Sequence, residues 1–137
     1  MVASINMTMD LALTVFLLLT IKHAVCDLYL QSFLTLDKSR YLGGWPHYAE
    51  HALGTFVVVA WFVDPVIAVA IALLDGVAHG HIDWLKHRVI SAYEHTTGMT
   101  MESNRKHTYW FVQAVDQTLH FLTYYLICLI IISQHHV

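Results

Sequence analysis

The sequence predicts an all-α fold, a polytopic membrane protein in which four transmembrane helices form one antiparallel bundle. The chain of 137 residues is 57% hydrophobic and only 12% charged, whereas soluble domains carry roughly twice that charged fraction. Its apolar runs approach the ~20 residues that a bilayer core requires, and polar connections separate them. The length fits a single membrane domain, residues 1–137.

The first predicted helix covers about residues 11–34 and opens with an unbroken apolar run except for Thr14. No basic region precedes it and no small-x-small cleavage site precedes His23, so we read it as a helix of the mature protein and not as a signal peptide. A connection over about 35–46 follows. It ends in Gly-Gly-Trp-Pro, a turn that also places an aromatic side chain near the membrane interface.

The second and third helices are predicted over about 47–63 and 65–90, separated by Asp64-Pro65. Aspartate is a good N-cap and proline suits the first helical position, so we expect a tight antiparallel hairpin. The alternative is one kinked helix of ~40 residues, about 60 Å long, which exceeds a bilayer core of ~30 Å. A polar connection over about 91–106, with or without a short surface helix, leads to a fourth helix over about 107–133.

Lysine and arginine are distributed unevenly between the two ends of this bundle. Six of the seven lie in or beside the connections 35–46 and 91–106, and none lies in the termini or the Asp64-Pro65 turn. By the positive-inside rule, both connections are cytoplasmic and both termini are outside. The polar residues within all four helices then lie in the cytoplasmic half, ~6–20 Å from that surface at ~1.5 Å per residue.

Two H-x-x-x-D motifs, His23 to Asp27 and His79 to Asp83, carry the main chemical signal. Residues four apart share one face of a helix, so each motif should direct an imidazole and a carboxylate the same way. Ionisable groups within a membrane are costly and tend to face the bundle interior. Imidazoles and carboxylates on facing helices build metal sites in helical bundles. The predicted metal ligands are His23, Asp27, His51, His79, Asp83, Asp116 and His120.

Zinc is the first choice of metal, with iron and manganese as alternatives. Four histidines and three aspartates exceed the needs of one tetrahedral ion, so both one and two ions stay open. The predicted catalytic residues are Asp116, Gln117 and Lys86, with Lys86 and Arg88 also suited to hold a phosphate or carboxylate. Further residues predicted to surround the ligands or contact the substrate are Lys22, Gln31, His81 and Arg88, although His81 leaves the face of His79.

Other conspicuous residues receive structural assignments. Asp64 is expected to be a cap only, and Asp75 to make a hydrogen bond between helices. The tryptophans fit an aromatic belt, and Tyr124-Tyr125 fits packing or membrane anchoring. Cys26 and Cys128 form neither a disulfide framework nor a CxxC motif. Residues expected at the solvated interface are His47, Glu50, His87, Glu94, His95 and His107.

The order of these motifs along the chain resembles a known pattern: H-x-x-x-D-x-x-x-Q, a lone histidine, H-x-x-x-D-x-x-K, then D-Q-x-x-H. It is similar to the small bacterial and phage membrane proteins filed as a domain of unknown function, number 3307. The matching residues are His23, Asp27, Gln31, His51, His79, Asp83, Lys86, Asp116, Gln117 and His120. The resemblance implies a bacterial inner membrane or a phage-infected host membrane, and it implies one shared site but no activity. By analogy alone, the chemistry is similar to membrane-bound metal-dependent hydrolases, including the seven-helix zinc ceramidases.

The sequence therefore predicts a metal-dependent hydrolase that acts on a lipid or other amphiphile from the cytoplasmic leaflet. One alternative is a metal or proton binder or carrier without catalysis, and another is a helical interaction protein with structural polar residues. The bilayer and a lipid-like substrate are the expected partners, and a homodimer stays open. A net charge of -3 without a basic face excludes nucleic acid.

Overall fold

The computed structural model describes residues 2–30 and 41–134, with side chains over 9–30 and 43–134. Within these residues every regular element is helical, as the sequence predicts. The elements are α1 (Val2–Ala24), the π-helix η1 (Val25–Tyr29), the 3-10 helix η3 (Tyr41–Gly44), α2 (Trp45–Val59), α3 (Pro65–Thr97), α4 (Met101–Asn104) and α5 (Lys106–Gln134).

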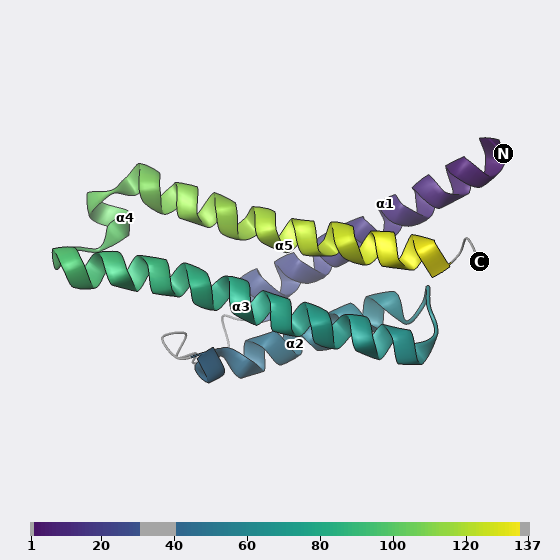
Figure 1. Cartoon of the computed structure of the whole chain (residues 1–137), viewed down its shortest axis with the longest axis horizontal. Coiled ribbons are helices and arrows are strands. Elements are labelled where there is room, and N and C mark those ends of the chain that lie inside the picture. The colour runs from purple at the N-terminus through teal and green to yellow at the C-terminus, as the bar shows by residue number, and fades with distance from the viewer. Residues whose placement is uncertain (1, 31–40, 135–137) are drawn as a thin grey trace.

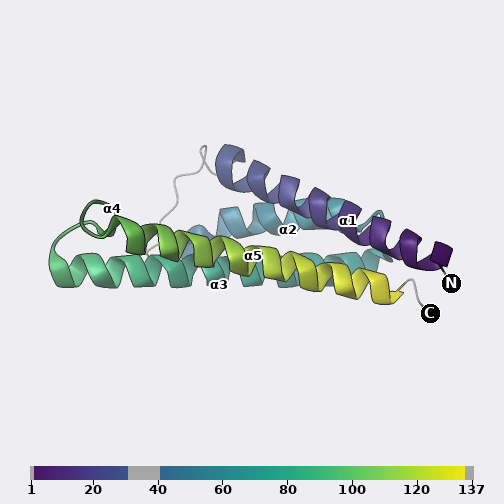
Figure 2. The same cartoon turned by 90° about the horizontal axis from the view of Figure 1, so that it is seen from above.

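The four longer helices run alternately up and down the molecule, so that the start of α1, the α2–α3 turn and the end of α5 lie at one end (Figure 1). Helices α2 and α5 each pack against both α1 and α3, which closes the four into a ring (Figure 2). An apolar core fills the end near the α2–α3 turn. Its buried members are Val15, Leu19, Val59, Ala68, Ile71, Tyr124, Ile127, Cys128 and Ile131.

Three of the helices are long and apolar enough to cross a membrane: Met9–Tyr29, Pro65–Thr97 and Lys106–Gln134. Their outer faces carry exposed apolar side chains, such as Leu73, which is 62% exposed, and Leu126, which is 52% exposed. These features suggest a membrane location. Helix α2 has 15 residues, about 22 Å, which is shorter than a bilayer core of ~30 Å. The sequence prediction of four long helices therefore holds, and among the residues that the structure describes three of them have the length and hydropathy of a span.

The predicted α2–α3 hairpin is confirmed. The Asp64 carboxylate accepts a hydrogen bond of 2.9 Å from the backbone N–H of Val66, and Pro65 occupies the first turn. The predicted end of the third helix near residue 90 is wrong, because α3 continues to Thr97. Residues 91–97 contain no glycine or proline, and the helix ends only at Gly98, whose φ of 67° is the left-handed conformation that glycine adopts without strain.

The first helix also differs from its prediction, since it begins at Val2 and not near residue 11. Its predicted end near residue 34 lies outside the described residues. The predicted connection over 91–106 contains the last turns of α3 and the short helix α4, which accords with the predicted surface helix.

Candidate metal centre

Two glycines on α3 allow that helix to approach α2 closely. A Cβ atom at Gly80 would lie 2.8 Å from the ring of Tyr48, and one at Gly76 would lie 2.9 Å from the Cβ of Ala52. Both distances are below ordinary carbon contacts of ~3.5–4.0 Å. The missing side chains therefore set the distance between the two helices. This approach brings His47, beside Tyr48 in the chain, against His79, beside Gly80.

Four buried or half-buried side chains converge between α2, α3 and η1, and we call them the trihistidine set: Asp27, His47, His51 and His79. The three imidazoles are at most 1% exposed. Their Nε2 atoms lie 3.2 Å, 2.9 Å and 3.7 Å, respectively, from the same Asp27 oxygen, Oδ1. Each of the four residues offers one ligand atom, and these four atoms all lie within 4.8 Å of one another.

The dimensions of the trihistidine set suit a tetrahedral cation. Metal–nitrogen and metal–oxygen bonds of ~2.0–2.2 Å place tetrahedral ligands about 3.3–3.6 Å apart. The three distances to Asp27 Oδ1 bracket this value, and the Nε2 atoms of His47 and His79 lie 3.1 Å apart. Imidazole nitrogens and a carboxylate oxygen are also the donors that zinc, iron and manganese accept. These buried groups could hold a metal ion.

A second group, which we call the three-ligand set, consists of His79, Asp83 and His120, all buried. His120 is oriented for it: its Nδ1 lies 2.9 Å from the backbone oxygen of Asp116. Because a carbonyl oxygen only accepts hydrogen bonds, Nδ1 carries the proton. In the neutral ring Nε2 then offers a lone pair, and it has no hydrogen-bond partner within the described residues. A metal-ligating histidine is commonly fixed in this way.

Asp27 lies in the π-helix η1. The wider turn of a π-helix changes the direction of the side chains that follow it, so Asp27 and His23 contact different helices. His23 faces α5, where its Nδ1 lies 2.9 Å from the hydroxyl of Tyr124 and its Nε2 lies 3.1 Å from Oε1 of Gln117. The same Nε2 lies 3.3 Å from Asp27 Oδ2. His23 therefore holds the oxygen of Asp27 that does not face the trihistidine set.

A buried ion pair supports the centre from the apolar side. Lys22 Nζ donates to Asp75 Oδ2 at 3.0 Å, and Thr55 donates to the same oxygen at 2.6 Å. Lys22 Nζ also lies 3.2 Å from Nδ1 of His51 and 3.2 Å from the hydroxyl of Tyr124. The predicted hydrogen bond of Asp75 between helices is thus confirmed. Lys22, predicted to surround the ligands or contact substrate, is 7% exposed and joins α1, α2, α3 and α5.

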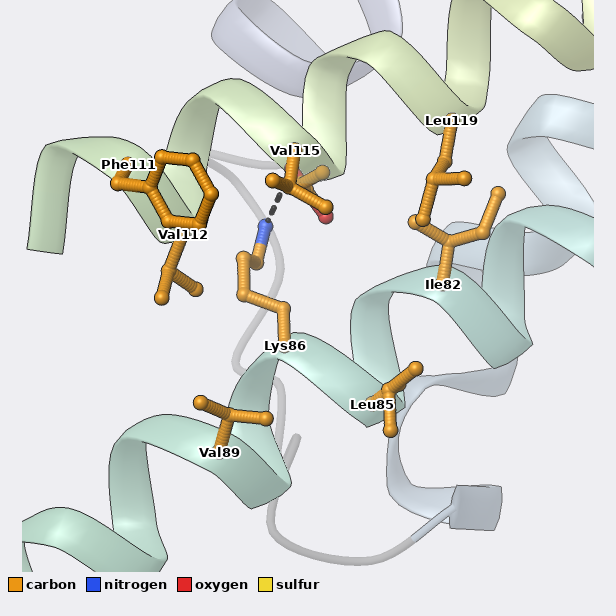
Figure 3. A pocket seen from close by; sticks show the side chains of 9 residues that line it. Ile82, Leu85, Lys86, Val89, Phe111, Val112, Val115 and Leu119 are labelled. Atoms are coloured by element: carbon orange, nitrogen blue, oxygen red, sulfur yellow. Dashed lines mark hydrogen bonds and ion pairs between the residues drawn. The ribbon is translucent and has the colours of Figure 1, made fainter. Parts of the chain in front are cut away.

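On the opposite side, Lys86 connects α3 to α5. Its Nζ donates to Asp83 Oδ1 at 3.1 Å and to Asp116 Oδ2 at 3.0 Å. Figure 3 shows the Lys86 side chain reaching from α3 toward α5. The side-chain amide of Gln117 also donates to Asp116 Oδ2, at 3.1 Å. The second oxygen of Asp116, Oδ1, is buried and has no partner among the described residues. The three predicted catalytic residues therefore form one hydrogen-bonded group beside the three-ligand set.

No family model, curated protein or solved structure matches this chain.

The predicted ligands separate into two groups in the structure. The ligand atoms come together for Asp27, His51, His79, Asp83 and His120. His23 and Asp116 lie next to them but in neither set. His81 is exposed, with Nδ1 2.9 Å from the backbone oxygen of Val77, as expected from its departure from the His79 face. Arg88 is also exposed, with its guanidinium 5.8 Å from the centre of the Trp84 ring. Gln31 lies outside the described residues.

Two interfacial assignments were wrong. His47 is fully buried and belongs to the trihistidine set. The spacing His47-x-x-x-His51 on a helix is the sequence signal that identifies it, because residues four apart share one face. Glu50 is only partly exposed, with its carboxylate 3.6 Å from His47 Nδ1. Tyr124 is buried, which agrees with packing, one of its two predicted roles. Its hydroxyl also contacts His23 and Lys22, a polar role that no sequence motif indicates.

Proposed function

We propose that this protein is a membrane metal-dependent hydrolase whose substrate is a lipid or another amphiphile. The observation that carries the proposal is the convergence of the trihistidine set, in which three imidazole nitrogens surround one buried carboxylate oxygen. Burying so many ionisable groups between apolar helices is costly. A cation bound to the trihistidine set would offset that cost, so a metal centre accounts for the burial of these four side chains.

The two ligand sets fit different roles. The trihistidine set supplies four ligands and would fill a tetrahedron, which is typical of a structural ion. The three-ligand set supplies two histidines and one carboxylate, which is typical of catalytic zinc with a position left for water. His79 belongs to both sets through the same Nε2 atom, and a neutral imidazole offers one lone pair, so the two sets are alternative positions for an ion that His79 binds. We propose the three-ligand set as the catalytic position. A bound ion there would lower the pKa of its water to ~7 and supply hydroxide at neutral pH.

Lys86 supports a catalytic role for the neighbouring group. An ammonium has three N–H donors, and two of them go to Asp83 and Asp116. The third donor can hold the oxygen of a scissile carbonyl or similar group as negative charge develops on it. Gln117 bonds both to Asp116 and to His23, and His23 in turn contacts Asp27 of the trihistidine set.

The buried apolar core favours an enzyme over a carrier. Beyond Asp75 and Tyr124, the interior toward the α2–α3 turn is closed by side chains such as Leu19, Val59 and Ile71, each at most 3% exposed. A carrier needs polar groups or water on both sides of its ion site. By the distribution of lysine and arginine, we propose that the polar end faces the cytoplasm.

Metal content and hydrolysis test the proposal. The full-length protein, purified in detergent without added metal or chelator, is analysed by inductively coupled plasma mass spectrometry and assayed on ester, amide and phosphoester amphiphiles. We expect stoichiometric zinc, iron or manganese, and activity that a chelator abolishes and the metal restores. His120→Ala should lose the activity, while His81→Ala, which changes an exposed histidine two residues from His79 on another face of α3, should keep it. Metal-free protein, or activity indifferent to chelator and to His120→Ala, refutes the proposal.

A further inference from the structure

A lateral cavity opens between α3 and α5 next to the three-ligand set. It has a volume of about 150 Å³ and lies between apolar side chains of the two helices (Figure 3). Ile82, Leu85 and Val89 line it from α3, and Phe111, Val115 and Leu119 line it from α5. Both helices are candidate membrane spans, so the mouth of the cavity would face the hydrocarbon of a bilayer. Its shape and lining suit an alkyl chain.

Among the described residues that line the cavity, Lys86 and Asp116 are the polar ones. The ammonium of Lys86 lies between two carboxylates, those of Asp83 and Asp116. Asp83 is also a proposed metal ligand, so with an ion bound there the charge left at the cavity is that of Lys86 paired with Asp116, which is neutral overall. A phosphate or carboxylate, which the sequence predicts for Lys86 and Arg88, would therefore meet an ammonium already paired with a carboxylate and not a free positive charge. Arg88 itself lies over Trp84 and does not line the cavity.

Asp116 indicates which polar group would be accepted. Its side chain is 1% exposed, and its Oδ1 atom has no hydrogen-bond partner within the part of the chain that the structure describes. A buried carboxylate oxygen without a donor is costly. A ligand that brings an N–H or O–H group to this atom would satisfy it, whereas an anionic ligand would add a further unpaired acceptor.

We propose that this cavity binds the alkyl chain of an amphiphile whose polar end is a neutral or cationic hydrogen-bond donor received by Asp116 Oδ1. The inference rests on the proposed function for its catalytic meaning, since it names the substrate class of the same site. Binding itself needs only the cavity and Asp116. The chain would lie between α3 and α5, with its polar end beside Asp83 and His120.

Photoreactive probes of one chain length test this class. The full-length protein in phosphatidylcholine nanodiscs is labelled with alkyl diazirines that end in an alcohol, a primary ammonium or a carboxylate, and the labelled peptides are mapped. We expect the alcohol and ammonium probes to label residues 82–89 and 111–119 about tenfold more than the carboxylate probe, the effect of one hydrogen bond to a charged group. Equal labelling by the carboxylate overturns the proposal.

Variants of the cavity sharpen the result. Val115→Trp fills it and should abolish labelling by every probe, while Leu122→Trp, on an exposed part of α5 outside the lining, should not. Asp116→Asn keeps an acceptor oxygen but removes the charge, so it should weaken the ammonium probe and spare the alcohol. Labelling that survives Val115→Trp overturns the proposal. Metal content is measured on the same samples, so a protein that binds donor probes but no metal refutes the hydrolase alone.

Discussion

The close approach of α2 and α3 yields the sharpest test, through Gly80→Ala. The added methyl carbon would lie 2.8 Å, 2.9 Å and 3.0 Å from three ring carbons of Tyr48. Restoring contacts of ~3.5–4.0 Å requires a displacement of about 0.5–1.2 Å. Metal–ligand distances tolerate only ~0.2 Å. Since His47 precedes Tyr48 and His79 precedes Gly80, this displacement moves two ligands apart by more than a metal centre accepts.

We expect Gly80→Ala to weaken metal binding at least tenfold in competition with a chromophoric chelator, and to lower the free energy of unfolding by about 1–3 kcal/mol through overpacking. Gly98→Ala is the matched control. It strains a left-handed residue at the end of α3, by about 1–2 kcal/mol, but has no atom within 4 Å of its new Cβ and lies away from the ligands. The control should lose stability and keep its metal.

The double variant Tyr48→Ala with Gly80→Ala separates the clash from any other effect of alanine. Removing the ring removes the contact, so metal affinity should recover toward that of Tyr48→Ala alone. A folded Gly80→Ala protein that binds metal as tightly as the wild type would refute the reasoning that these glycines set the ligand spacing.

Three further predictions concern the same centre. His47→Ala should reduce metal affinity at least as much as His51→Ala, measured by the same chelator competition. An affinity unchanged from wild type would show that His47 is not a metal ligand. Metal affinity should fall as the pH is lowered, because protons compete with the metal for imidazole nitrogens. Burial lowers the pKa of His51 to about 3, so the fall should come below the ordinary imidazole range, and an affinity that stays flat down to pH about 3 in folded protein contradicts histidine ligation. Lys22→Met should lower the free energy of unfolding, measured by denaturant titration, by about 3–5 kcal/mol, since it leaves Asp75 buried without its cation. The double variant Lys22→Met with Asp75→Leu should lose clearly less stability. An equal loss would show that the unpaired charge of Asp75 does not cause the destabilisation.

The predicted fold came from patterns that lie within single segments. Apolar runs, the Asp64-Pro65 cap and the polar connections act locally, and they correctly predict the helices and their alternating direction. Errors arose where a boundary had no local signal. Residues 91–97 are polar but contain neither glycine nor proline, so α3 continues to the left-handed Gly98.

The sequence could predict those site residues that lie four apart on one helix. Two H-x-x-x-D motifs led to Asp27, His79 and Asp83, which lie in the two ligand sets. The division between ligands and supporting residues was not predictable, because it depends on distances between helices. His23 lies near the end of α1 and Asp27 follows it in η1, yet one faces Tyr124 and the other faces His47 and His51.

His47 shows a different limit. It follows Gly-Gly-Trp-Pro, a turn sequence typical of a membrane surface, and depth alone places it there. Its burial results from η1, α2 and α3 meeting at the polar end of the bundle, which no linear pattern reports.

The π-helix at residues 25–29 makes the geometry of the centre sensitive to chain length. A π turn contains one more residue per turn than an α turn, and each residue in an α-helix advances the direction of a side chain by about 100°. Deleting a single residue from η1 would let the segment become ordinary α-helix and would rotate α1 before the deletion relative to Asp27. Lys22 and His23 would then leave Asp75 and Tyr124, while Asp27 kept its place against α2. One inserted residue in an apolar helix therefore allows the same element to serve two partners, with α5 on one side and the histidines of α2 on the other.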